Sequence, residues 1–210
     1  MNSIVSEKRF ISQTLGVPYE NLSQSYLRSE TELTTTSVID FTLQTNKKQG
    51  SLVTERLLDL NDEFVITHFT VGLKQISAAA PTVQEQLIAP VLTYDNKTAF
   101  AGANGSNVSA IYNSDLSWTI DRREFIPQFP MRAFRRVPTT QEATIGAALG
   151  IDGFDNGLYA FYPSEPTRIN GRQTIDLSVN LNDSTIFTDA GNSYYAVFEA
   201  RGYLVVNAAS

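Results

Sequence analysis

Residues 175–181 read IDLSVNL, a strict alternation of apolar and polar side chains. This period of two predicts a β-strand with one face in a core and the other in solvent. The stretch 194–206, YYAVFEARGYLVV, is more apolar and predicts a second strand, with a bulge at Gly202. Residues 62–75, DEFVITHFTVGLKQ, carry apolar side chains in both phases, so we expect this strand to be buried on most of both faces.

Weaker patterns lie between these three stretches. Alternation or short apolar runs predict four further strands, at 37–45, 91–94, 108–112 and 116–120. The segment 121–138 contains three prolines, which restrict any strand there to a sheet edge. Asn170-Gly171 lies between extended runs and predicts a tight hairpin turn.

Three segments have helical signals. In residues 3–15, Ile4, Ile11 and Leu15 fall on one face, and Gly16 and Pro18 end the pattern. Two capping boxes predict short helices over 82–89 and 140–149: Thr82-x-x-Glu85 and Thr139-x-x-Glu142. The polar stretch 19–36 predicts an extended arm or a loop that becomes ordered against a neighbouring molecule.

The strands are not separated by regular helices, which argues against a βαβ arrangement. We therefore predict an all-β fold: a single jelly-roll-like antiparallel β-sandwich of about eight strands, with an N-terminal helix and two short inserted helices. Residues 1–36 are expected to form the helix and arm, and residues 37–210 the jelly-roll domain. On this division, a chain lacking residues 1–36 should fold but assemble poorly.

Composition excludes much enzyme chemistry. The chain has no cysteine and one histidine, which removes thiolate nucleophiles, disulfides, Cys-based zinc sites and multi-His metal sites. A net charge of −6 argues against a surface that binds nucleic acid as a whole. The N-terminus has no apolar signal-peptide core and no stretch is long and apolar enough to span a membrane, so we expect a soluble, non-secreted chain.

No residue is predicted to be catalytic, to ligate a metal or to bind a cofactor. His68 could act as a general base, but no nucleophile motif surrounds it, and a hydrogen-bonded strand histidine is the simpler interpretation. The loop 152–157 is rich in oxygen ligands but lacks the spacing of an EF-hand. Carboxylate pairs across a cleft would suit a glycosidase, although the sequence places no two of the candidates together: Asp59, Asp62, Glu63, Asp115, Asp121 and Glu124.

The segment 121–136 is a candidate interaction surface. Five arginines stand there, interleaved with three phenylalanines and Met131, against only two acidic residues. Arginine interleaved with aromatic residues is typical of subunit interfaces. A genome-facing patch and a solvated edge are the alternatives.

Three segments resemble bacteriophage virion proteins: NDEFVITHFTVGL (61–73), IYNSDLSWTIDRREFIPQFPMRAFRRVPTTQ (111–141) and YAVFEARGYLVVN (195–207). The similarity is to jelly-roll capsid proteins of phages that infect Bacteroidetes-type hosts. It implies a non-enzymatic subunit of an icosahedral shell, with no active site to transfer. At 210 residues the chain has room for one jelly roll, unlike the larger double jelly-roll capsid proteins.

The expected function is therefore that of a virion structural protein, a capsid-shell subunit assembled in the host cytoplasm through contacts with its own copies and other virion proteins. A decoration, spike or vertex protein is the nearest alternative. Whether a membrane lies under the shell is left open. A carbohydrate-binding β-sandwich module is the alternative from another class, with aromatic side chains to stack on sugar rings: Tyr94, Tyr112, Trp118, Tyr159 and Tyr162. Of these, Trp118 lies in the apolar phase of its strand and is expected in the core.

Overall fold

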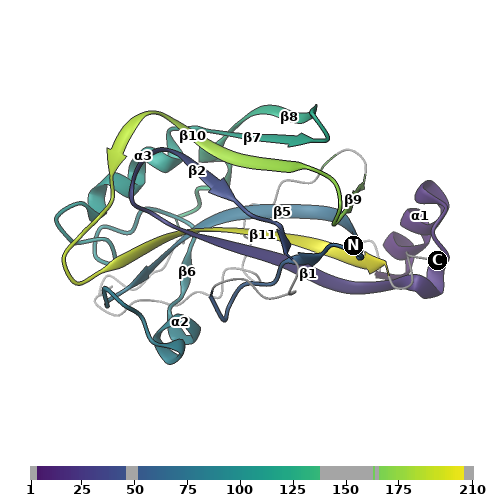
Figure 1. Cartoon of the computed structure of the whole chain (residues 1–210), viewed down its shortest axis with the longest axis horizontal. Helices are drawn as coiled ribbons and strands as arrows, with labels where there is room; N and C mark the ends of the chain where they lie inside the picture. The colour runs from purple at the N-terminus through teal and green to yellow at the C-terminus, as the bar shows by residue number, and fades with distance from the viewer. Residues whose placement is uncertain (1–3, 46–51, 138–162, 164–165, 206–210) are drawn as a thin grey trace.

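The computed structural model describes residues 4–45, 52–137, 163 and 166–205. Two antiparallel sheets pack face to face in it (Figure 1). The first sheet has the order β1-β11-β5-β6, with β9 also paired to β5, and the second has the order β2-β10-β7-β8. Their strands are β1 (Leu22–Glu32), β2 (Thr35–Phe41), β5 (Glu63–Ile76), β6 (Val91–Leu92), β7 (Asp115–Ile120), β8 (Arg123–Pro130), β9 (Thr167–Asn170), β10 (Ile175–Ile186) and β11 (Ser193–Val205).

Within the described residues, eight strands have four or more residues. Numbered along the chain, they follow the order 1-8-3-6 in one sheet and 2-7-4-5 in the other. This is the strand order of a jelly roll, in which two Greek keys fold across each other. The predicted fold class is confirmed, and β8 lies at a sheet edge, as its prolines require.

The remaining elements are helices, 3₁₀ turns and one short strand pair. They are α1 (Ile4–Leu15), α2 (Val83–Ile88), α3 (Ser109–Tyr112), the 3₁₀ turns η1 (Tyr19–Asn21), η2 (Gly105–Val108) and η3 (Met131–Phe134), and a small parallel pair, β3 (Gln44–Thr45) with β4 (Leu58–Asp59). The predicted N-terminal helix is confirmed. The capping box at Thr82 also forms as predicted, because its side chain and that of Glu85 each bond the other's backbone N–H. The helix predicted over 140–149 lies outside the described residues.

An aromatic cluster fills the space between the sheets. Trp118 on β7 is fully buried and meets Phe69 on β5 edge to face, with ring centroids 5.4 Å apart. It meets Phe198 on β11 in the same way at 5.7 Å. Edge-to-face packing suits the aromatic quadrupole and adds to the gain from burial. Trp118 is therefore a core residue, as its strand phase predicts.

A second, smaller core lies on the outer face of the first sheet. There α1 packs Ile11 and Leu15 against Leu22, Val65 and Tyr203. Ile11 is fully buried, so this contact anchors the helix to the sheet. Each fully buried aliphatic side chain of this kind contributes roughly 1.5–3 kcal/mol.

Three predictions about local structure are wrong. Residues 22–32, inside the segment expected to be an arm or loop, form β1, which pairs with β11 along its whole length. Residues 108–112, predicted as a strand, lie in η2 and α3. Asn170-Gly171 does not close a hairpin, because β9 pairs with β5 in one sheet whereas β10 belongs to the other.

The bulge predicted at Gly202 is present, but the extra residue is on the partner strand. Arg201 pairs with His68 and Gly202 with Ile66, so Thr67 on β5 is left without a partner in the ladder. A β-bulge turns the side chains around it and increases the local twist. This places Thr67 and His68 side by side on the outer face.

Candidate functional site

The outer face of the first sheet carries a polar depression. Antiparallel register aligns Tyr26, Arg201 and His68 in one row across β1, β11 and β5. The next row along the strands contains Arg28, Glu199 and Thr70. We call the depression over these rows the outer trough; its volume is about 530 Å³, and it is lined by Glu7, Gln24, Ser25, Tyr26, Arg28, Thr67, His68, Glu199, Arg201, Gly202 and Tyr203.

The wall of the outer trough nearest the N-terminus comes from α1. Glu7 Oε2 accepts a hydrogen bond of 3.2 Å from the Tyr203 hydroxyl, which ties the helix to β11. Burial and the nearby Glu7 carboxylate raise the pKa of Tyr203 to about 12. The Tyr203 hydroxyl therefore remains protonated and acts as a donor throughout the physiological range.

The floor of the outer trough is charged but balanced. Arg201 Nε donates to Glu199 Oε1 at 3.3 Å. Burial raises the pKa of Glu199, although Arg28 and Arg201 oppose the shift. Burial, reinforced by the positive charge of Arg201, lowers the pKa of His68, so this imidazole is neutral at pH 7.

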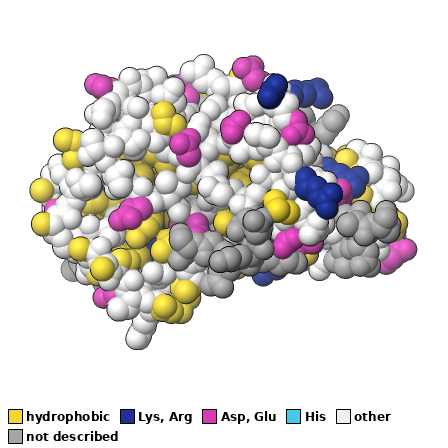
Figure 2. Space-filling view, in the orientation of Figure 1, with side chains coloured by type: hydrophobic (Ala, Val, Ile, Leu, Met, Phe, Trp, Pro, Cys, Tyr) yellow, Lys and Arg dark blue, Asp and Glu magenta, His cyan; other side chains and the backbone are white. Residues whose placement is uncertain are grey.

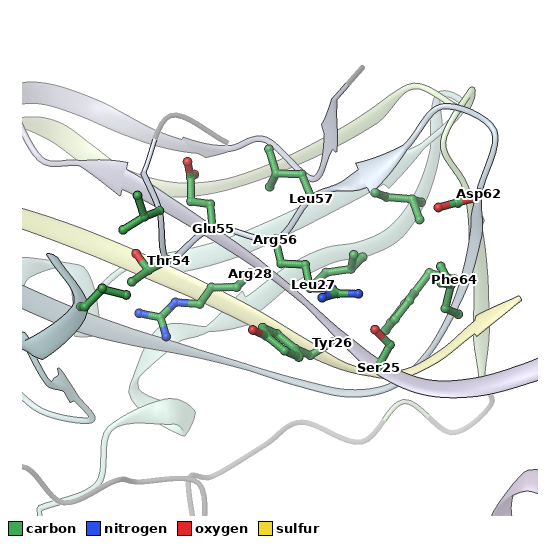
Figure 3. A pocket seen from close by; sticks show the side chains of 14 residues that line it. Ser25, Tyr26, Leu27, Arg28, Thr54, Glu55, Arg56, Leu57, Asp62 and Phe64 are labelled. Atoms are coloured by element: carbon green, nitrogen blue, oxygen red, sulfur yellow. The ribbon is translucent and has the colours of Figure 1, made fainter. Parts of the chain in front are cut away.

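A second cavity of about 580 Å³ adjoins the trough at the edge of β1 (Figure 3). Tyr26 and Arg28 line both cavities. The other side of this second cavity comes from residues 52–57, which we call the 52–57 strap. Backbone hydrogen bonds join Arg56 to Arg28 in both directions, at 2.7 and 2.8 Å, so the strap holds the edge of β1.

A buried ion pair lies under the 52–57 strap. Lys74 Nζ on β5 lies 2.9 Å from Glu30 Oε2 on β1, and both side chains are fully buried. Burial raises the pKa of Glu30, but Arg28, Thr54 and Lys74 outweigh it and the net pKa is lowered. Burial lowers the pKa of Lys74, and Glu30 opposes that shift. Glu30 is therefore an anion, stabilised by two cations and by the strap.

Glu30→Gln should destabilise the fold by about 3 kcal/mol, because it leaves the Lys74 ammonium buried without its counter-charge. The measurement is urea unfolding at pH 7. Glu32→Gln, two residues along the same strand and exposed, is the matched control and should change stability by less than about 0.5 kcal/mol. An equal effect of the two substitutions would contradict the role assigned to the pair.

His68, the candidate general base, lines the outer trough. Its Nδ1 lies 3.0 Å from Thr67 Oγ1, and the ring is half-buried on the outer face instead of inside the sandwich. The prediction that the chain has no catalytic residue stays a prediction.

Four of the candidate carboxylates have structural roles as ion-pair or hydrogen-bond partners: Asp59, Glu63, Asp115 and Asp121. Glu63 pairs with Arg168 and also accepts from Asn170. Asp121 accepts from the Thr174 N–H at 2.9 Å. Asp59 accepts a hydrogen bond from Asn61 N, and Asp115 accepts one from Gln128 Nε2. Asp62 lines the second cavity, and Glu124 is exposed on β8. Within the described ranges there is no cluster of three groups able to hold a metal ion, and the loop 152–157 lies outside them.

In the candidate interface segment 121–136, the apolar side chains and the arginines point in different directions. Its large apolar residues turn inward: Phe125 packs on Trp118, and Phe134 is buried against Phe129. Arg135 pairs with Asp95 at 2.8 Å, whereas Arg122, Arg123 and Arg132 are exposed. The exposed charge of the segment is therefore mostly arginine, with Phe125 and Phe129 only partly buried beside it, and the role of the segment in an interface or genome contact stays a prediction.

The aromatic residues considered for sugar binding do not gather at one site. Trp118 and Tyr112 are buried in the core, and Tyr94 is half-buried with its hydroxyl bonded to Asn96. Tyr159 and Tyr162 lie outside the described residues. Of the described residues that line the outer trough, the sequence interpretation considered only His68 as a site residue and missed the others, among them Tyr26, Arg28, Glu199 and Arg201. The signal for the last two is visible in hindsight, since they are in phase with Tyr203 in an otherwise apolar strand.

Two further observations bear on identity. No helix among the described residues is both long and apolar enough to cross a bilayer. Comparison with known protein families and with curated proteins finds no match to this chain.

Proposed function

We propose that this chain is a virion structural protein, a capsid-shell subunit that assembles through contacts between its own copies. The observation that carries the proposal is the apolar surface of α2. Val83, Leu87 and Ile88 are exposed by 57%, 62% and 71%, and no residue of the helix is buried. Figure 2 shows hydrophobic side chains at the surface in this region. A capped helix that keeps its apolar residues in solvent is typical of a protein-binding surface.

Two further exposed apolar side chains lie on α1, apart from α2. Val5 and Phe10 on α1 are exposed by 48% and 54%. Figure 1 shows α1 at one end of the sandwich and α2 well apart from it, beside β6. Contacts between two different patches on identical chains are heterologous, and such contacts build closed rings and shells or open filaments. Two separated patches therefore support repeated assembly better than a single symmetric dimer.

The fold and the sequence resemblance support a capsid role within this assembly class. Jelly rolls are used by viral capsid domains, although lectins and cupins share them, so the fold alone does not decide the function. The resemblance to jelly-roll capsid proteins of Bacteroidetes phages favours the virion, assembled in the host cytoplasm together with other virion proteins. A decoration or vertex protein is the nearest alternative, and the number of copies in the particle distinguishes it from a shell subunit.

The test is the native mass of the purified chain, measured by light scattering over a range of concentrations, with electron microscopy of the same samples. We expect symmetric rings or closed shells. A closed shell built from hundreds of copies of the chain identifies the major capsid protein. Small rings identify a vertex or decoration protein. A strict monomer at millimolar concentration would overturn the proposal.

Leu87→Ser combined with Ile88→Ser should weaken assembly without unfolding the chain, because both side chains are exposed on α2. Removing two apolar anchors from a contact should raise the concentration needed for assembly at least about tenfold. Light scattering measures that concentration, and circular dichroism reports the fold. Ile186→Ser is the matched control, since Ile186 is also exposed, by 49%, but lies on β10 in the second sheet and not on α2.

A further inference from the structure

We propose that the outer trough binds a neutral oligosaccharide. Its volume of about 530 Å³ lies within the usual range for small-ligand sites. Among the described residues that line it there is no aliphatic side chain, and two arginines stand against two glutamates. An apolar ligand would leave these groups unsatisfied, and a strongly charged ligand would upset their balance. A ligand rich in hydroxyl groups fits both conditions.

Glu199 supplies the acceptor on the floor of the outer trough. Its side chain is only 8% exposed, and in the described part of the chain it accepts one side-chain hydrogen bond, of 3.3 Å from Arg201. A carboxylate has about four acceptor positions. A buried anion with unused acceptor capacity at the floor of a cavity is suited to receive hydroxyl donors, and such charge-assisted bonds are the stronger kind.

The donors lie around this acceptor. The Arg201 side chain is 41% exposed and follows Glu199 on the same face of β11. Gln24 lines the same space from β1. Arginine and amide groups beside a carboxylate give the mixture of donors and acceptors that a sugar, with both on every hydroxyl, requires.

Tyr26 supplies the stacking surface. Its side chain is 42% exposed in the row of Arg201 and His68. The Arg56 guanidinium lies 5.6 Å from the Tyr26 ring centroid, and backbone bonds hold Arg56 beside Arg28 (Figure 3). The 52–57 strap thus fixes the ring at one side of the outer trough. An exposed ring held in place offers apolar area for the C–H face of a sugar at little cost in entropy.

An anionic ligand is the main competing occupant. Arg201 lies within 3.3 Å of Glu199, and Arg28 Nη2 lies 2.7 Å from Glu30. A phosphate or carboxylate group would have to displace these partners or lie beside their charges. The described contacts therefore favour the neutral ligand.

The test is titration calorimetry of the full chain, in its native assembly state, with neutral gluco-, manno-, xylo- and galacto-hexasaccharides. We expect at least one to bind. Tyr26→Ala and Glu199→Gln should each lower its affinity about tenfold, whereas Tyr26→Phe, which keeps the ring, should stay within about twofold. Tyr19→Ala is the matched control, because Tyr19 is 38% exposed but lies outside the outer trough.

Three results would overturn the proposal: no hexasaccharide binds, binding survives both Tyr26→Ala and Glu199→Gln, or inorganic phosphate binds more tightly than every sugar. If Glu199→Gln proves unfolded by circular dichroism, Gln24→Ala replaces it in the comparison with Tyr26→Ala. The test is independent of the assembly proposal, because a monomer that binds sugar and a shell that does not are both observable outcomes.

Discussion

Deletion of residues 1–36 should abolish folding, contrary to what the sequence division at residue 36 implies. The deletion removes β1, whose 11 residues all pair with β11. It also removes Leu27 and Leu33 from the main core and Glu30 from its buried pair with Lys74. Losing a paired strand together with buried apolar side chains exceeds the 5–15 kcal/mol that a domain of ordinary stability has available. Circular dichroism and thermal melting should show an unfolded chain.

Deletion of residues 1–16 is the informative control. It removes α1 but keeps β1, so both sheets stay complete. The loss of the fully buried Ile11 should lower stability by about 2–5 kcal/mol while leaving a cooperative melting transition. A cooperative transition in the longer deletion would show instead that β1 is dispensable and that the jelly-roll domain begins near residue 37.

β1 escapes sequence prediction for a physical reason. Its core-facing positions include Leu27 and Ser29, and its outward positions include Arg28 and Glu30. Alternation of apolar and polar residues is therefore weak in both phases. The strand is held by tertiary features that a local pattern does not contain: full-length pairing with β11, the 52–57 strap and the ion pair with Lys74. Charged side chains are common on edge strands because they discourage pairing with another chain.

Elements with a strong local signal were predictable. The two-sided apolar run of β5 and the alternation in β10 follow directly from the sheets on which they lie. The short run at 108–112 was not, because a few apolar residues suit a helix turn as well as a strand. Gly171 was misassigned for another reason: an added Cβ would meet Asp59 O at 2.0 Å, so this glycine allows a close backbone approach instead of a hairpin turn.

The outer trough shows why a site built across several strands is hard to predict from the sequence. Tyr26, His68 and Arg201 are far apart in the sequence and become neighbours only through the register of three strands. The bulge at Thr67 adjusts that register by one residue on β5. A one-residue change moves every following side chain to the opposite face, so no composition or spacing argument could have assembled this row.

Gly202→Ala should destabilise the fold by more than about 4 kcal/mol, because no side chain fits at this position. A Cβ there would lie 1.8 Å from Val65 O and 2.9 Å from Val65 C, and both are backbone atoms of β5. Backbone of a central strand has little freedom to move, since β11 pairs with β1 on one side and with β5 on the other. Any shift that relieves the clash breaks hydrogen bonds around the bulge and opens the floor of the outer trough.

Gly191→Ala separates this clash from the general cost of replacing a glycine. Gly191 has a φ of +88°, and an added Cβ meets nothing within 4 Å. Backbone strain alone should therefore cost about 1–2 kcal/mol there. Urea unfolding of the two variants measures the difference. If Gly202→Ala were no more destabilising than Gly191→Ala, β5 and β11 could not approach as closely as the bulge requires, and the row of Tyr26, Arg201 and His68 would lose its structural basis.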